Sequence, residues 1–268
     1  MLGGYAVHQA FLLARIGLDD IPERDRCDAM RCDAINNTVD RMYSTTRSLR
    51  LVERHTIDRM VTTGHKTAEA SADLRLQRGA RSRRAVTSRA VDIASQDGLD
   101  VLSFGRLAGD LGMSKAGIQT LFRTKEALQL ATVEAAQEAF IEAVVRPAQD
   151  SPAGVARIRA LVDRWIDYAA RPLFAGGCFW GANLPIFDSR PGPVRDALLA
   201  QQRAWRTTLA AQFERAVTAG EVGDLDPEVA AFQISAVLNA VNLALRLGED
   251  DSVSMARQVI DRMLRGDT

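Results

Sequence analysis

The segment FGRLAGDLGMSKAGIQTLFRTKEAL, residues 104–128, contains two short runs of helical apolar periodicity and the start of a third. Ser103, Ser114 and Thr124 each precede one run, where a hydroxyl can accept a hydrogen bond from a free N–H group of the first turn. All three are also candidates for contact with DNA. Gly112 follows the first run, at the position where a left-handed residue commonly ends a helix. The two short helices and their turn have the spacing of a helix-turn-helix, which we predict here.

The helix after Ser114 is predicted to have two different sides. Ile118, Leu121 and Phe122 form an apolar side that can be fixed against a support. The opposite side carries small or polar residues, namely Lys115, Ala116, Gly117, Gln119 and Thr120. A helix enters the DNA major groove only if its outer side is slim and offers donors and acceptors to base edges. Lys125, at the start of the next helix, would add a cation to free N–H groups and clamp a phosphate.

Charge is distributed unevenly, although the net charge of the chain is zero. Residues 78–125 hold 9 basic and 4 acidic side chains, whereas residues 126–268 hold 14 basic and 19 acidic ones. The arm RLQRGARSRR supplies three arginines for phosphates or the minor groove, namely Arg81, Arg83 and Arg84. Residues 78–125 are thus basic and residues 126–268 are acidic. This suggests that only the basic segment binds a polyanionic partner. The alternative is a solvated face or leader that contacts nothing.

The remaining pattern predicts an all-α protein. Helices are expected at about residues 82–96, 124–145, 151–170, 193–219, 226–247 and 252–265, and no strand pattern competes with them. Ser151 and Pro152 are placed to begin the third of these, and residues 173–187 look irregular because three glycines and Pro185 interrupt them. We predict three parts: a weakly structured leader (1–77), a helix-turn-helix DNA-binding domain (78–125), and a larger helical ligand-binding and dimerisation domain (126–268).

Aromatic side chains gather between residues 165 and 205. The candidate ligand-binding residues are Trp165, Tyr168, Phe174, Cys178, Phe179, Trp180, Asn183, Phe187 and Trp205. An apolar cavity with a few polar groups is one interpretation, and plain core packing is the other. A nucleophilic cysteine needs a base, yet the three histidines all lie in the leader. Cys178 is therefore expected to be a packed apolar residue, with a sensing role as the alternative.

Residues 226–247, DPEVAAFQISAVLNAVNLALRL, are apolar nearly all round. A helix with so little polar surface is buried, either in the core of its own domain or in a dimer interface. We favour an interface in which this helix and the last one pair with their symmetry mates as four helices.

The leader and the composition exclude several classes. The leader is either a mobile extension or the product of an over-long gene start, with Met60 or Val61 as the first residue. Cys27 and Cys32 have poor zinc spacing, so we predict no metal. No apolar run suggests a membrane span or signal peptide, which predicts a cytoplasmic protein. Titratable residues do not cluster and no phosphate-binding glycine loop occurs, so the sequence predicts neither an enzyme nor a cofactor.

Residues 83–128 resemble the DNA-binding domain of the TetR family of transcriptional regulators. The resemblance rests on a basic lead-in, a helix, an Asp-Gly turn, and the motifs LAGDLGMSKAGI and LFRTKEAL. The later helices resemble a TetR-type regulatory domain in number and order. One departure is Gln119, where the family commonly has a tyrosine that contacts a phosphate. Gln119 would then contact a phosphate itself or read an adenine.

The resemblance implies a homodimer that binds a palindromic double-stranded DNA operator, with its recognition helices roughly 34–36 Å apart. It also implies repression that a small-molecule effector relieves, which requires the effector to bind the two states unequally. The alternatives from other classes are a non-specific architectural DNA-binding protein, which would need a basic body, and a helical enzyme.

Overall fold

The structure is a computed structural model that describes residues 62–171 and 173–265, and side chains from residue 76 onward. Within these residues all regular elements are helices, which confirms the predicted all-α class. The predictions for residues 1–61, which include the suggested start at Met60 or Val61 and the pair Cys27 and Cys32, lie outside the described part.

The first elements form the predicted helix-turn-helix. They are α4 (Thr62–Asp97), the short 3₁₀ helix η2 (Leu99–Val101), α5 (Phe104–Leu111) and α6 (Lys115–Phe122). The predicted start of the first helix was wrong, because α4 begins at Thr62 rather than near residue 82. Residues 62–81 include four alanines and three arginines, which favour helix, so helix propensity extends α4 without a consistent apolar face.

The later elements make up a helical bundle. They are α7 (Lys125–Phe140), the π-helical turn η3 (Ile141–Val145), α8 (Arg146–Ala148), α9 (Val155–Ala170), α10 (Phe179–Phe187), α11 (Pro193–Thr218), α12 (Pro227–Arg246) and α13 (Ser252–Arg265). The segment predicted to be irregular contains α10, with Pro185 inside it. Its high apolar content lets tertiary packing override the helix-breaking residues.

The start of α9 also differs from the prediction. Gly154, not Ser151, is its N-cap residue, and its φ of 90° lies in the left-handed region that favours glycine. The carboxylate of Glu221 accepts a hydrogen bond from the Val155 N–H group at 2.7 Å. A distant side chain therefore supplies the cap that the local sequence lacks.

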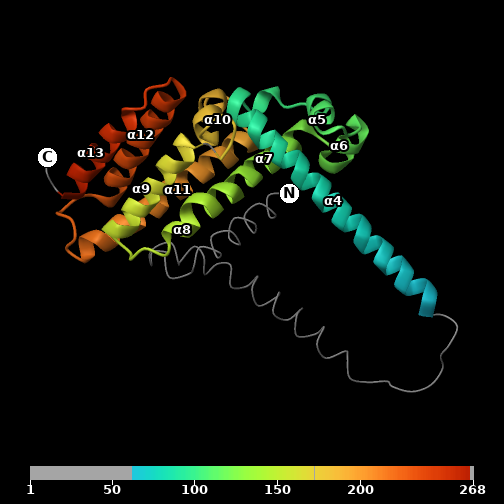
Figure 1. Cartoon of the computed structure of the whole chain (residues 1–268), viewed down its shortest axis with the longest axis horizontal. Coiled ribbons are helices and arrows are strands. Elements are labelled where there is room, and N and C mark those ends of the chain that lie inside the picture. Colours follow the sequence, from blue (N-terminus) through green and yellow to red (C-terminus); the bar gives the residue numbers. More distant parts are fainter. Residues whose placement is uncertain (1–61, 172, 266–268) are drawn as a thin grey trace, which may run out of the picture. The chain divides into compact units, whose positions relative to one another are not determined.

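Residues Gln77–Thr268 form one compact unit. Helix α11 lies in its interior, against α7, α9, α10 and α12. Helices α12 and α13 pack together at the end of the unit opposite α5 and α6 (Figure 1). One hydrophobic core runs through the unit, from Val86 on α4 to Leu264 on α13. The helix-turn-helix and the bundle therefore share buried surface.

Candidate nucleic-acid interface and regulatory core

The caps of the helix-turn-helix lie where the sequence predicts them. Ser103, Ser114 and Thr124 each accept a hydrogen bond from the N–H group three residues later, at 3.0–3.1 Å. Gly112 ends α5 with φ of 62°, and the Met113 N–H group donates to the Ala108 carbonyl at 3.0 Å. Local hydrogen bonds therefore set the turn between α5 and α6.

Helix α6 separates its buried and exposed sides as predicted. Ile118 and Phe122 are buried, and Leu121 is half-buried. The predicted DNA-facing residues are all exposed, namely Lys115, Ala116, Gln119 and Thr120. The Thr120 hydroxyl donates to the Ala116 carbonyl at 2.9 Å. Small and polar side chains thus form an accessible face on a helix whose other side is fixed in the core.

The predicted basic arm is part of α4. Arg81 and Arg84 are exposed on it. Arg83 is also exposed, but its Nη1 donates to the Leu121 carbonyl at 2.9 Å, and its Cζ lies 4.5 Å from the centre of the Phe122 ring. The hydrogen bond joins residues 38 positions apart, and no local sequence pattern predicts it.

Lys125 also bonds within the protein. Its ammonium group donates to the carbonyl of Asp100 in η2, and the Asp100 carboxylate pairs with Arg190 at 3.5 Å. Lys125 remains exposed at the start of α7. An ammonium group has three donors, so this bond leaves donors for a phosphate.

Asn183 joins α10 to the end of α4. Its Oδ1 accepts from the Leu99 N–H group at 2.7 Å, and its Nδ2 donates to the carbonyls of Ala94 and Phe179 at 3.0 and 2.8 Å. The side chain is fully buried. The sequence predicts a ligand contact at Asn183, whereas both of its N–H donors and its oxygen bond to the protein here.

Gly176 lies against the last turns of the same helix. Its N–H group donates to the Ser95 hydroxyl at 2.9 Å. A Cβ atom at Gly176 would lie 2.0 Å from the Ser95 carbonyl oxygen, which is backbone. The glycine that was expected to interrupt a helix therefore allows two backbones to approach closely.

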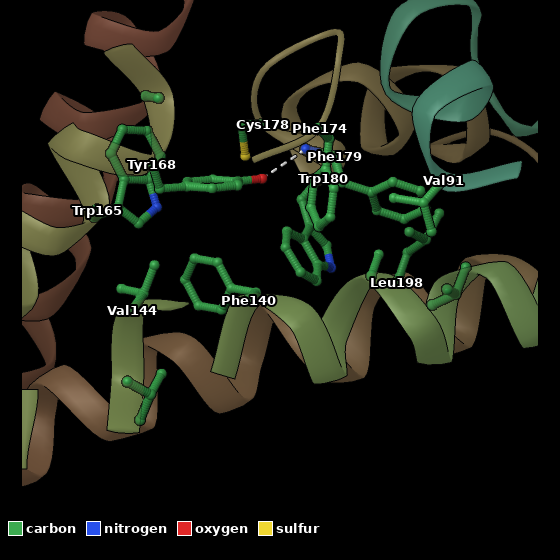
Figure 2. Close-up of a cluster of buried hydrophobic side chains, with 14 of the residues drawn as sticks. Val91, Phe140, Val144, Trp165, Tyr168, Phe174, Cys178, Phe179, Trp180 and Leu198 are labelled. Carbon is green, nitrogen blue, oxygen red and sulfur yellow. Dashed lines mark hydrogen bonds between the residues drawn. The ribbon is translucent and has the colours of Figure 1, made fainter. Parts of the chain in front are cut away.

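The aromatic residues pack against one another (Figure 2). Phe140, which the sequence places on its helix but not in the candidate pocket, is central to the cluster. Its ring lies edge-to-face with those of Tyr168, Trp180 and Trp205, at centroid distances of 5.3, 5.2 and 5.5 Å. The predicted pocket residues are buried, except Trp205, which is half-buried. Edge-to-face packing of this kind is typical of a hydrophobic core.

Polar groups within this cluster have partners. The Phe179 N–H group donates to the Tyr168 hydroxyl at 3.0 Å, as Figure 2 shows. The Trp180 indole donates to Gln201 at 3.0 Å, and Gln201 in turn donates to the Val133 carbonyl at 3.2 Å. These bonds connect α7, α9, α10 and α11 through buried groups, which makes the arrangement specific.

Cys178 lies at the start of α10 with its side chain buried. Burial raises the pKa of its thiol, which therefore stays protonated at neutral pH. Burial also raises the pKa of Tyr168, to which the neighbouring Cys178 contributes. The environment fits the prediction of a packed apolar residue. Within residues 62–171 and 173–265, no group of three His, Cys, Asp or Glu side chains is arranged to hold a metal ion.

Helices α12 and α13 carry an exposed apolar face. Its members are 52–70% exposed and comprise Val229, Phe232, Leu243, Leu247, Met255 and Val259. The other side of α12 is buried in the core at Ile234, Leu238 and Val241. By length and composition α12 is apolar enough to cross a membrane, although this is weak evidence from a single helix. Helix α12 therefore has one side in the core and one apolar side that is exposed.

Comparison with known proteins gives one family. Residues 154–260 match the family described as tetracyclin repressor-like, C-terminal domain. No curated protein sequence matches the chain.

Several solved structures share the fold. A TetR transcriptional regulator from Chloroflexus aurantiacus J-10-FL is 24% identical with a TM-score of 0.64, covering 69% of this chain and 94% of that one. A TetR-family regulator from Agrobacterium tumefaciens is 18% identical with a TM-score of 0.62, covering 68% and 98%. AibR, in complex with isovaleryl coenzyme A and operator DNA, is 21% identical with a TM-score of 0.50, covering 63% and 96%.

Proposed function

We propose that this chain, whose residues 154–260 match the tetracyclin repressor-like C-terminal domain family and whose fold is shared by TetR-family regulators, is a DNA-binding transcriptional regulator of the TetR family. It would bind a palindromic operator as a homodimer and repress until a small molecule binds. Residues 78–125 would contact DNA, and residues 126–268 would bind the effector and the second subunit. The proteins it resembles are transcriptional regulators rather than enzymes. A regulator of this kind acts where the DNA is, so we infer a cytoplasmic location.

The observation that carries the proposal is the geometry of α6. Its buried residues belong to the hydrophobic core, where α6 packs against α5 and α7. Its outer face presents Lys115, Gln119 and Thr120 to solvent. A major-groove reader needs both features, because base edges are recognised only by side chains held in a defined register. Arg81 and Arg84 on α4 and Lys125 at the start of α7 are exposed cations that would contact phosphates.

The exposed face of α12 and α13 supports the homodimer. Its six apolar side chains are each more than half exposed, and the two helices that carry them pack against each other. An exposed set of large apolar side chains is typical of an interaction surface. Exposed Ala236 and Ala240 lie between Phe232 and Leu243 on α12, where small side chains allow another helix to approach. A twofold axis here would pair α12 and α13 with their copies, and the two α6 helices would face the same DNA.

Segment 174–183 is well placed to transmit an effector's binding. It carries Phe174, Phe179 and Trp180 of the aromatic cluster, and it also makes the bonds of Gly176 and Asn183 to the end of α4. AibR, of similar fold, has been solved with both an acyl-coenzyme A and DNA. We propose that a small molecule which displaces aromatic side chains of this cluster moves segment 174–183 and, through it, α4. Such a molecule must bind the two states unequally.

Base preference tests the proposed role of α6. Lys115→Ala and Gln119→Ala are each expected to change the sequences that the protein selects from a random pool of duplexes, with discrimination at one base pair falling by about 1–3 kcal/mol. Sequencing of the bound DNA measures this. Exposed Glu126, which we do not expect to contact bases, supplies the control Glu126→Ala. If both variants select the wild-type sequence with the wild-type preference, α6 does not read the bases.

A further inference from the structure

Arg83 holds the C-terminal end of α6. The carbonyl of Leu121 belongs to the last turn of that helix, where carbonyls have no partner within the helix. The Arg83 guanidinium donates to it at 2.9 Å and covers the Phe122 ring at 4.5 Å. A cation at this end also interacts favourably with the helix dipole.

The backbone ends α6 abruptly at this point. Arg123 has φ of 61°, the only positive value for a non-glycine residue in the described part of the chain. Its N–H group donates to the Gln119 carbonyl at 2.7 Å, and the Thr124 N–H group donates to the Phe122 carbonyl at 2.7 Å. These local bonds satisfy the carbonyls of Gln119 and Phe122, and Arg83 supplies a partner for the Leu121 carbonyl from outside the helix.

Helix α4 acts as a frame for both short helices. Arg89, six residues after Arg83, contacts the Asp110 carboxylate on α5 through two nitrogens at 2.8 Å. Arg83 makes the equivalent connection to α6. One arginine on α4 therefore holds each helix of the helix-turn-helix, which fixes their angles relative to α4.

We propose that Arg83 is a positioning residue for DNA recognition, fixing the tilt of α6 rather than neutralising a phosphate. The inference rests on the proposed DNA-binding function. Contacts with base edges require side chains held within about 0.5 Å of the correct position, so a tilted α6 loses sequence preference. A phosphate contact behaves differently, because each one contributes about 0.9 to the slope of log affinity against log salt for every sequence.

The experiment compares Arg83→Ala, Arg83→Lys and the neighbouring control Arg84→Ala in the full chain. Fluorescence anisotropy measures affinity for the duplex that the wild type selects and for a scrambled duplex, from low to high NaCl. Lysine keeps the positive charge of arginine but lacks its planar guanidinium group. Only the guanidinium can donate to the Leu121 carbonyl while it stacks on the Phe122 ring. Measurements are made below the onset of thermal unfolding, and the lysine variant decides the result if the alanine variant does not fold.

The ratio of interest is the affinity for the selected duplex divided by the affinity for the scrambled duplex. We expect both Arg83 variants to lower this ratio by about tenfold, which is the effect of losing one base contact. Their salt slope on scrambled DNA should equal that of the wild type, whereas Arg84→Ala should lower the slope by about 0.9 and keep the ratio. A lower slope with an unchanged ratio for Arg83→Ala, or wild-type behaviour of Arg83→Lys, would overturn the positioning role. A wild-type chain that prefers no sequence would instead refute the DNA-reading function itself.

Discussion

The double variant Phe232→Glu, Leu243→Glu is expected to be monomeric and to lose operator affinity by about 10²- to 10⁴-fold. The two side chains are 58% and 61% exposed and lie eleven residues apart on α12, which places them on the same side of the helix. Burying two carboxylates without partners in a subunit interface is strongly unfavourable. A monomer then binds only one half-site of the operator. It loses the additional affinity that a dimer has because its two DNA-binding domains bind together.

Light scattering and anisotropy on the selected duplex would measure these two effects. Because both residues are exposed within one chain, the fold of the monomer should persist, and circular dichroism would verify it. Leu173→Glu, at an apolar residue that is 44% exposed and lies outside α12 and α13, is the matched control and should stay dimeric. A double variant that remains a dimer would place the interface elsewhere.

Gly176→Ala is expected to lower the free energy of unfolding by more than about 3 kcal/mol. The added methyl group would lie 2.0 and 2.1 Å from the carbonyl oxygen and carbon of Ser95, and 2.4 Å from the Gln96 nitrogen. These are all backbone atoms at the end of α4, so no side chain can rotate away. Relief requires the segment and α4 to move apart, which breaks the bond between the Gly176 N–H group and the Ser95 hydroxyl.

Urea unfolding monitored by circular dichroism measures the change. Gly223→Ala is the matched control, because nothing lies within 4 Å of its added Cβ atom. Its effect should stay within about 0.5 kcal/mol. If Gly176→Ala costs no more than the control, segment 174–183 does not contact α4 as closely as described, and the proposed path from the aromatic cluster to DNA loses its tightest contact.

Local features of this protein could be predicted from its sequence. The caps at Ser103, Ser114 and Thr124 depend on residues within one helical turn, and so does the left-handed Gly112. The buried side of α6 follows from helical periodicity alone. The all-α class and the position of the helix-turn-helix depend on the same short-range rules, which is why the structure agrees with them.

Features that depend on distant partners could not be predicted in this way. Glu221 caps α9 from 66 residues away, and Arg83 bonds to α6 across 38 residues. Asn183 looked like a polar group for a ligand because its partners at Ala94 and Leu99 are invisible until the chain folds. Pattern rules likewise gave a short first helix, since α4 extends beyond the residues that carry its apolar face.

In the proposed function, α6 reads DNA as part of a symmetric dimer. The most direct test is selection of duplexes from a random pool by the purified wild-type chain, followed by sequencing of the bound DNA. We predict enrichment of an inverted repeat with half-site centres about 10–10.5 base pairs apart or a multiple of this, bound by an even number of chains. Enrichment of no sequence, or of a single site without twofold symmetry, would contradict the claim.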